Sequence, residues 1–254
     1  MAVAGIDMGA LVTKVVILNT NRILGAATLM TGETGETEAR QAMDEALKQA
    51  GLKLEDIKSV VATGTGRAKV SFAQKQRTAM SCHAKGACFL FPEARTVIDV
   101  GAESSAAILL SADGKVSDSV SNDKCAAGSG IFLDAMSRML RVPLAEMGPE
   151  SLQATEAVPI TSMCVIFAES EVISHVHRDP PVPRSNILAG IHASITDRLY
   201  GMAQRVGAES PVVMTGGASK NIGIVRALEA KLGTTVLVPE DPQIVGALGA
   251  ALLA

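Results

Sequence analysis

Short apolar runs alternate with small polar turns in the first part of the chain, a pattern that is typical of β-hairpins. Four such runs predict strands, at Val3–Ile6, Thr13–Leu18, Ile23–Leu29 and Val60–Ala62. Between the third and fourth runs, apolar residues recur at helical spacing from Thr37 to Ala50, and Gly51 ends the helix. The segment therefore predicts a three-stranded hairpin unit followed by a helix and a fourth strand.

This opening pattern returns once. Asp7 and Asp99 lie 92 positions apart, and residues 97–102 follow the same strand–Asp-x-Gly template as residues 5–10. Two further strands of the second copy are expected at Ala106–Leu110 and Lys115–Val120. The repeat suggests two related lobes, although two hairpins can also resemble each other by chance.

The second half of the chain is mostly helical. Four helices are expected, at Gly130–Leu140, Ile166–Val176, Asn186–Val206 and Ile244–Leu253. A strand at Val212–Met214 leads into a glycine-rich turn that is expected to open one more helix. The pattern indicates an α/β protein, with one lobe at 1–94 plus about 243–254 and the other at 95–242.

Composition narrows the function class. The 254 residues are 48% hydrophobic but only 2% aromatic, and the formal net charge is −3 without a block of like charges. These features argue against nucleic-acid binding. No leader and no membrane-length apolar stretch is visible, so we expect a soluble, cytoplasmic protein. Four cysteines in such a protein favour thiols or metal ligands over disulfides.

Two Asp-x-Gly turns end buried strands and carry the first candidate chemistry. Gly9 and Gly101 allow the backbone to approach a phosphate, and the exposed N–H groups of such turns form an anion cradle. A carboxylate beside phosphate makes sense when it positions a hydrated Mg²⁺. Asp7 and Asp99 are therefore candidate Mg²⁺-positioning residues.

Other residues extend this candidate site. Thr13 and Lys14 are placed to offer a hydroxyl and a cation to the phosphates. Thr215, Gly216 and Gly217 form a third turn, expected to use a helix N-terminus for a phosphate or nucleoside contact. One glycine-rich turn is often only a tight connection, but three turns in this order are more specific.

The order of these turns resembles the actin-like ATPase superfamily. The resemblance implies a two-lobed actin/Hsp70/hexokinase-like (ribonuclease H-like) fold, in which duplicated mixed β-sheet lobes sandwich ATP or ADP. Two other function classes fit this fold: a small-molecule kinase of the sugar type, and a non-catalytic actin-like protein that forms filaments.

Cys125 and Cys164 each precede a predicted helix, where the helix N-terminus favours a thiolate. A four-iron cluster usually needs four thiolates, which a symmetric dimer would supply by contributing both cysteines twice. Two small buried cysteines remain the alternative from spacing alone. Cys82 and Cys88 point to different faces of a helical stretch and are expected to be packing residues. An intrachain metal site that uses all four cysteines is the alternative.

Residues 122–130 and 164–174 resemble the cysteine motifs of the ATP-dependent activators of 2-hydroxyacyl-CoA dehydratases and their benzoyl-CoA reductase relatives. The resemblance covers essentially the whole chain. It implies one [4Fe–4S] cluster per dimer, with Cys125 and Cys164 of each subunit as ligands. It also implies ferredoxin or flavodoxin as electron donor, and a dehydratase or reductase component that receives one low-potential electron.

This chain departs from the family at its phosphate turns. Residues Ala10, Leu11 and Val12 stand where Ser and Thr are usual, which leaves backbone N–H groups to cradle phosphate. Glu103, Ser104 and Ala106 replace the usual Gln, Asp and Lys of the second turn.

These replacements leave two roles open for Glu103. It is a candidate to lie near the γ-phosphate and act on the attacking water, or a neutral replacement in a slow ATPase. The departures also permit a heterodimer with a paralogous ATPase subunit in place of a homodimer. The resemblance assigns Gln243, at the start of the closing motif, to the nucleotide site.

Overall fold

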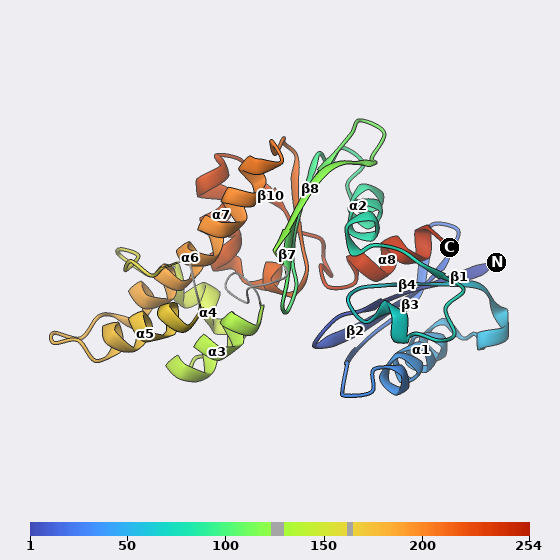
Figure 1. Ribbon diagram of the computed structural model, residues 1–254, viewed down its shortest axis with the longest axis horizontal. Helices are drawn as coiled ribbons and strands as arrows, with labels where there is room; N and C mark the ends of the chain where they lie inside the picture. Colours follow the sequence, from blue (N-terminus) through green and yellow to red (C-terminus); the bar gives the residue numbers. More distant parts are fainter. Residues whose placement is uncertain (123–129, 162–164) are drawn as a thin grey trace.

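The computed structural model describes residues 1–122, 130–161 and 165–254, and these residues form two five-stranded mixed sheets (Figure 1). The first sheet consists of β1 (Ala2–Met8), β2 (Val12–Asn19), β3 (Arg22–Met30), β4 (Ile57–Thr63) and β5 (Lys75–Gln76). The second consists of β6 (Thr96–Val100), β7 (Ser105–Leu110), β8 (Val116–Asn122), β9 (Val212–Thr215) and β10 (Val236–Leu237).

The two sheets have the same topology. Their strand orders are β3-β2-β1-β4-β5 and β8-β7-β6-β9-β10, so each strand of one sheet has a counterpart in the other. In both sheets the first three strands pair antiparallel and the remaining two pair parallel. The repeat in the sequence therefore reflects a duplicated lobe, and the α/β fold with duplicated mixed sheets is confirmed.

The described residues also form eight α-helices, which are α1 (Glu36–Ala50), α2 (Ala79–Leu90), α3 (Gly130–Leu140), α4 (Leu144–Ser151), α5 (Val165–Val176), α6 (Arg184–Arg205), α7 (Ile222–Leu232) and α8 (Val245–Leu252). Three short 3₁₀ helices lie at η1 (Leu54–Asp56), η2 (Arg67–Lys69) and η3 (Gly217–Lys220). The helices with predicted ranges lie within two residues of those ranges. Helix α4 was not predicted, because Gly148 and Pro149 inside it are typical of a turn.

The side chains of β2 alternate between two apolar clusters, one on each face of the first sheet. Val15 and Ile17 belong to the apolar cluster under α1, whereas Val16 and Leu18 belong to the cluster under α8. Successive strand residues point to opposite faces, so a continuous apolar run fits a strand covered on both sides. The first sheet therefore lies between α1 and α8 (Figure 1).

The second sheet is covered in the same way. Ile98 and Val100 of β6 join a large cluster with residues of α3, α4, α6 and α7, including Phe132 and Met136. Val97, on the opposite face of the strand, packs with apolar residues of α2. The helical layer built by the second half of the chain is therefore the outer cover of this sheet (Figure 1).

Helices α2 and α8 lie between the two sheets and join the lobes (Figure 1). They pack closely because a side chain on Gly86 would collide with the carbonyl of Val245, and one on Gly249 with the carbonyl of Cys82. Helix α2 contributes its apolar residues to the core of the second sheet.

The lobe boundaries drawn from the sequence, 1–94 with about 243–254 and 95–242, stay a prediction. Among the described residues, no helix is long and apolar enough to cross a bilayer.

Candidate functional site

The first predicted phosphate turn is a tight connection between β1 and β2. The Gly9 N–H donates to the Val12 carbonyl at 3.1 Å, and the Thr31 hydroxyl donates to the Gly9 carbonyl at 2.8 Å. The N–H groups of Ala10 and Leu11 donate to no backbone or side-chain acceptor among the described residues. The turn therefore presents two consecutive free amides of the kind that cradle phosphate.

Thr13 does not have the position expected of it. Its side chain is fully buried, and its hydroxyl lies 3.0 Å from the Thr31 hydroxyl. Because Thr31 gives its proton to the Gly9 carbonyl, Thr13 is the donor of this pair. The predicted contact between the Thr13 hydroxyl and phosphate does not fit this geometry. Alternation along β2 turns the side chain inward, where it supports the turn through Thr31.

Lys14 lies where the sequence placed a cation. It faces Asp7 across the β1–β2 ladder, and its Nζ atom is 3.1 Å from Asp7 Oδ2. A methyl group on Gly9 would come within 3.2 Å of the same Nζ atom, so the ammonium group lies against the turn. The side chains of Lys14 and Asp7 are only 16% and 8% exposed, which limits the screening of this pair by solvent.

The second predicted turn repeats the geometry of the first. The Gly101 N–H donates to the Ser104 carbonyl at 2.8 Å, and Glu103 at the tip of the turn is exposed. The turn is also attached to the start of α3. The Gly130 N–H donates to the Gly101 carbonyl at 2.9 Å, and the next amide of the helix donates to the Ala102 carbonyl at 2.9 Å. A displacement of this turn would therefore move the first residues of α3.

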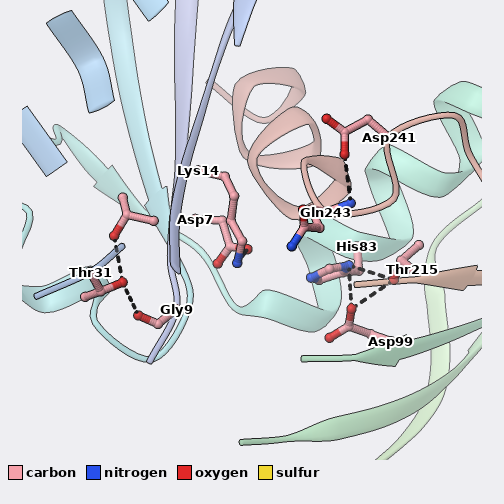
Figure 2. Close-up of polar contacts among 10 residues, drawn as sticks. Asp7, Gly9, Lys14, Thr31, His83, Asp99, Thr215, Asp241 and Gln243 are labelled. Carbon is pink, nitrogen blue, oxygen red and sulfur yellow. Dashed lines mark hydrogen bonds and ion pairs between the residues drawn. The ribbon is translucent and has the colours of Figure 1, made fainter. Parts of the chain in front are cut away.

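Asp99, at the end of β6, is held by two side chains from other elements (Figure 2). The Thr215 hydroxyl donates to Asp99 Oδ1 at 3.0 Å, and His83 Nδ1 is 3.3 Å from the same oxygen. Among the described residues, no hydrogen bond or ion pair reaches Asp99 Oδ2. The carboxylate is thus oriented through one oxygen while the other has no protein partner there.

His83 is a site residue that the sequence analysis missed. Cys82, His83, Gly86 and Ala87 are all buried and follow the spacing of one helix face. An imidazole on such a face needs a polar partner, and this signal was available in the sequence. Its partners Asp99 and Thr215 lie far along the chain, so only the fold identifies them.

Two positive-φ glycines lie against the strand-end aspartates. Gly64 has a φ of +87°, and a Cβ atom there would come within 2.5 Å of Asp7 Oδ1. Gly216 also has a φ of +87°, and its Cβ atom would come within 2.8 Å of Asp99 Oδ1. Each glycine thus allows close approach between a turn and a carboxylate.

The third predicted turn brings Gly216, Gly217 and Gln243 together. The Gly216 N–H donates to the Pro242 carbonyl at 2.9 Å, and a methyl group on Gly217 would lie 3.1 Å from Gln243 Nε2. The Lys220 ammonium donates to Gln243 Oε1 at 2.6 Å. The loop before α8 and the turn after β9 therefore form one continuous surface.

The helix expected directly after this turn is different in the structure. The residues that follow the turn form the short 3₁₀ helix η3, and α7 begins only at Ile222. Asn221 is the N-cap of α7, because its Oδ1 atom accepts the N–H groups of Gly223 and Ile224. The helix that begins at this turn is therefore the short η3, with Gly216 as its N-cap, and the N-terminus of α7 has its own cap. The predicted contact of Thr215, Gly216 and Gly217 with the nucleotide stays a prediction.

The cysteines predicted as cluster ligands, Cys125 and Cys164, lie outside the described residues. The described chain resumes with α3 after the first of them and with α5 directly after the second. Cys82 and Cys88 have free thiols, and burial raises the pKa of both. Raised pKa values keep these thiols protonated, which agrees with a packing role. Within the described ranges, no group of three or more His, Cys, Asp and Glu side chains is arranged to hold a metal ion.

Similar proteins share both the sequence and this architecture. The activator of lactoyl-CoA dehydratase from Anaerotignum propionicum is 48% identical over 254 residues, which cover 100% of this chain and 97% of that protein. A benzoyl-CoA reductase subunit from Thauera aromatica is 35% identical, with 98% of this chain and 91% of that protein covered.

A solved structure of the activator of the 2-hydroxyisocaproyl-CoA dehydratase from Clostridium difficile with bound ADPNP has a TM-score of 0.93 and 42% identity. The match covers 100% of this chain and 94% of that one. The family model described as the BadF/BadG/BcrA/BcrD ATPase family matches residues 4–254. The chain therefore belongs to the BadF/BadG/BcrA/BcrD ATPase family.

Proposed function

We propose that this chain is an ATP-driven electron donor that activates a 2-hydroxyacyl-CoA dehydratase or benzoyl-CoA reductase component. The observation that carries this proposal is the pair of equivalent Asp-x-Gly turns, one at the end of β1 and one at the end of β6. The names of the relatives supply the class of partner, because they include a dehydratase activator and part of a reductase.

The residues around the two aspartates fit a nucleotide with a divalent cation. Asp99 Oδ2 has no donor among the described residues, and Asp7 lies in the other lobe with one oxygen on Lys14. Carboxylate oxygens, often through water, are the ligands that Mg²⁺ prefers beside phosphates. When bound, the cation would neutralise charge on the transferring phosphate. Asp7 and Asp99 would hold and orient it.

The chain's own turns would hold the nucleotide. The amides of Ala10 and Leu11 and the Lys14 ammonium suit phosphate oxygens. Gly217 and Gln243 form a surface that suits the nucleoside. The relative of known structure with bound ADPNP supports nucleotide binding in this fold.

Glu103 is proposed to lie near the γ-phosphate, because it is exposed at the tip of the second turn. There its carboxylate would orient the attacking water or take its proton. Replacing Glu103 with Gln or Ala should lower ATP turnover. Unchanged turnover would remove it from the mechanism.

Coupling between nucleotide and cluster is proposed to run through α3. The amides of Gly130 and Ile131 donate to carbonyls of the second turn, and the segment with Cys125 directly precedes this helix. A phosphate that shifts the turn would shift the start of α3. Coupling also requires that the nucleotide bind the two arrangements with different affinity.

Cys125 and Cys164 are proposed as ligands of one [4Fe–4S] cluster shared between two subunits, either identical or paralogous. The cluster would supply one-electron chemistry, with ferredoxin or flavodoxin as the electron source. Helix α5, which begins directly after Cys164, exposes Ile166 and Phe167 at 69% and 64%. Large apolar side chains so exposed beside a proposed ligand suit burial in a subunit interface.

The test is to measure iron, acid-labile sulfide and ATP turnover in anaerobically purified protein. The proposal predicts all three, together with a change in the electron paramagnetic resonance spectrum of the reduced cluster when Mg-ATP is added. The Asp99→Asn variant should keep the cluster but lose the spectral change. A protein that turns over ATP without iron, or polymerises without iron, would instead be a kinase or a filament former.

A further inference from the structure

The imidazole of His83 lies between the two lobes at the candidate nucleotide site (Figure 2). It projects from α2, which packs against both α8 and the second sheet, and the residue is only 6% exposed. None of the roles proposed above for the nucleotide or the cluster uses this ring. Because the ring is buried, we expect each of its nitrogen atoms to have a hydrogen-bond partner.

The Nδ1 atom faces the second lobe. It lies 3.0 Å from the Thr215 hydroxyl oxygen and 3.3 Å from Asp99 Oδ1. The Thr215 hydroxyl has one proton, which it donates to Asp99 Oδ1. His83 must therefore donate from Nδ1, so the neutral ring carries its proton on Nδ1 and a lone pair on Nε2.

The Nε2 atom faces the first lobe. A methyl group on Gly246 would lie 2.9 Å from His83 Nε2 and 3.0 Å from Asp7 Oδ2. The nitrogen and the oxygen therefore both lie beside the side-chain position that Gly246 leaves empty, no farther apart than the sum of these two distances. When the ring is neutral both are hydrogen-bond acceptors, so the pair then suits a shared donor such as a water molecule.

We propose that His83 is a positioning residue that sets the spacing of Asp7 and Asp99 across the two lobes. The Nδ1–H group holds Asp99 Oδ1 and leaves Oδ2 without a protein partner among the described residues, and the Nε2 edge lies near Asp7 beside Gly246. Gly246 supports this role, because a side chain there would crowd both the ring and the Asp7 carboxylate. The inference rests on the proposed function, in which both carboxylates act on one nucleotide.

The first test is the separation of ATP binding from ATP turnover in His83→Asn, His83→Gln and His83→Ala. Asparagine retains a donor near the Nδ1 position, and glutamine places an amide near the Nε2 position. If His83 bridges the lobes, neither variant restores full turnover. We expect a loss on the order of 10²-fold in kcat for His83→Ala, with a much smaller change in KM. Without the ring, Asp7 and Asp99 would be misplaced, which slows the chemical step more than it weakens ATP binding.

His177→Asn is the matched control, because His177 is exposed on the segment that follows α5 and should keep the turnover of the unmodified protein. Thermal unfolding midpoints close to that of the unmodified protein would show that the variants fold. Turnover in His83→Asn equal to the unmodified protein would overturn the inference. Absence of ATP turnover in the unmodified protein would instead contradict the proposed function.

The second test reads the ring itself. The chain has four histidines, so ¹⁵N-histidine labelling gives a small set of ring signals, and the His83 signals are those missing in His83→Asn. We expect the Nδ1–H tautomer, a shift of the Nδ1 signal in Asp99→Asn, and a shift of the Nε2 signal in Asp7→Asn. An Nε2–H tautomer would overturn the inference. So would His83 ring signals whose chemical shifts stay unchanged in both Asp99→Asn and Asp7→Asn, even when these variants fold normally.

Discussion

Gly64 and Gly216 occupy equivalent positions in the two lobes. Each follows the threonine that lies opposite a strand-end aspartate in a parallel ladder, and each has a φ of +87°. Each also lies against the carbonyl of the residue that follows the aspartate, Met8 or Val100. The duplication is thus preserved at the level of individual atoms in the candidate site.

The first prediction follows from this equivalence. Gly64→Ala and Gly216→Ala should each destabilise the protein by more than Gly233→Ala, which has a similar positive φ but open space around the Cα atom. The control substitution should cost about 1 kcal/mol from backbone strain alone. The site substitutions add a collision with a carbonyl. Urea unfolding of the three variants checks this order, and equal losses would show that the close approach is unimportant.

The second prediction concerns the charge of the aspartates. Asp7→Asn and Asp99→Asn should each lower ATP turnover by about 10²–10³-fold, because the amide keeps the shape and loses the charge that would hold the cation. Asp44→Asn on the exposed side of α1 is the control and should turn over ATP normally. Steady-state assays over a range of Mg²⁺ concentrations provide the measurement. Normal turnover in Asp99→Asn would exclude it from the catalytic site.

The third prediction concerns the exposed start of α5. Phe167→Glu should shift the protein from dimer to monomer, because the charge would be buried at the proposed interface. Leu54→Glu is the control, since Leu54 is exposed on η1, between α1 and β4 in the chain. Sedimentation velocity under anaerobic conditions distinguishes the two species. A dimer that survives Phe167→Glu would place the interface elsewhere.

The fourth prediction is a pH dependence that arises from His192 on α6. Its Nδ1 atom lies 2.9 Å from the Ser151 hydroxyl, and its Nε2 atom lies 3.1 Å from the Asn221 amide nitrogen. The Asn221 oxygen already accepts two backbone amides, so the amide group donates to Nε2 and the ring is neutral. Burial lowers the pKa of the His192 imidazole to about 4.

The sign of the effect follows from proton binding. Below its ordinary pKa of about 6.5, His192 takes up a proton in the unfolded chain but not in the native protein until the pH falls to about 4. Stability should therefore fall by about 3 kcal/mol as the pH decreases through this window. Urea unfolding of the cluster-free protein measures the slope. His192→Asn should flatten it, and an unchanged slope in that variant would contradict the assignment.

The sequence predicted the elements whose signal is local. The Asp-x-Gly template located both turns, and the apolar spacing gave the bounds of Gly130–Leu140 as the structure has them. Helix α4 was not predicted, because Gly148 and Pro149 locally disfavour a helix. The helix is stabilised instead by tertiary packing, since Met147 is buried in the core of the second lobe.

The candidate site was less predictable, because its geometry depends on contacts between distant segments. The partner of His83 on β9 lies 132 positions away, which no local pattern reveals. Thr13 was assigned to phosphate although the alternation of β2 could have placed it inward with Val15 and Ile17. The start of α7 was also visible in principle, because Asn221 before an apolar run is a typical N-cap.

The iron content of anaerobically purified protein, compared with its Cys125→Ala and Cys164→Ala variants, tests the central claim most directly. We expect about two iron atoms per chain in the unmodified protein, as one four-iron cluster shared by two subunits requires. Each variant should lose this iron while still binding ATP, since neither cysteine belongs to the three turns proposed to hold the nucleotide. Iron at the unmodified level in both variants would contradict a subunit-bridging cluster held by these residues.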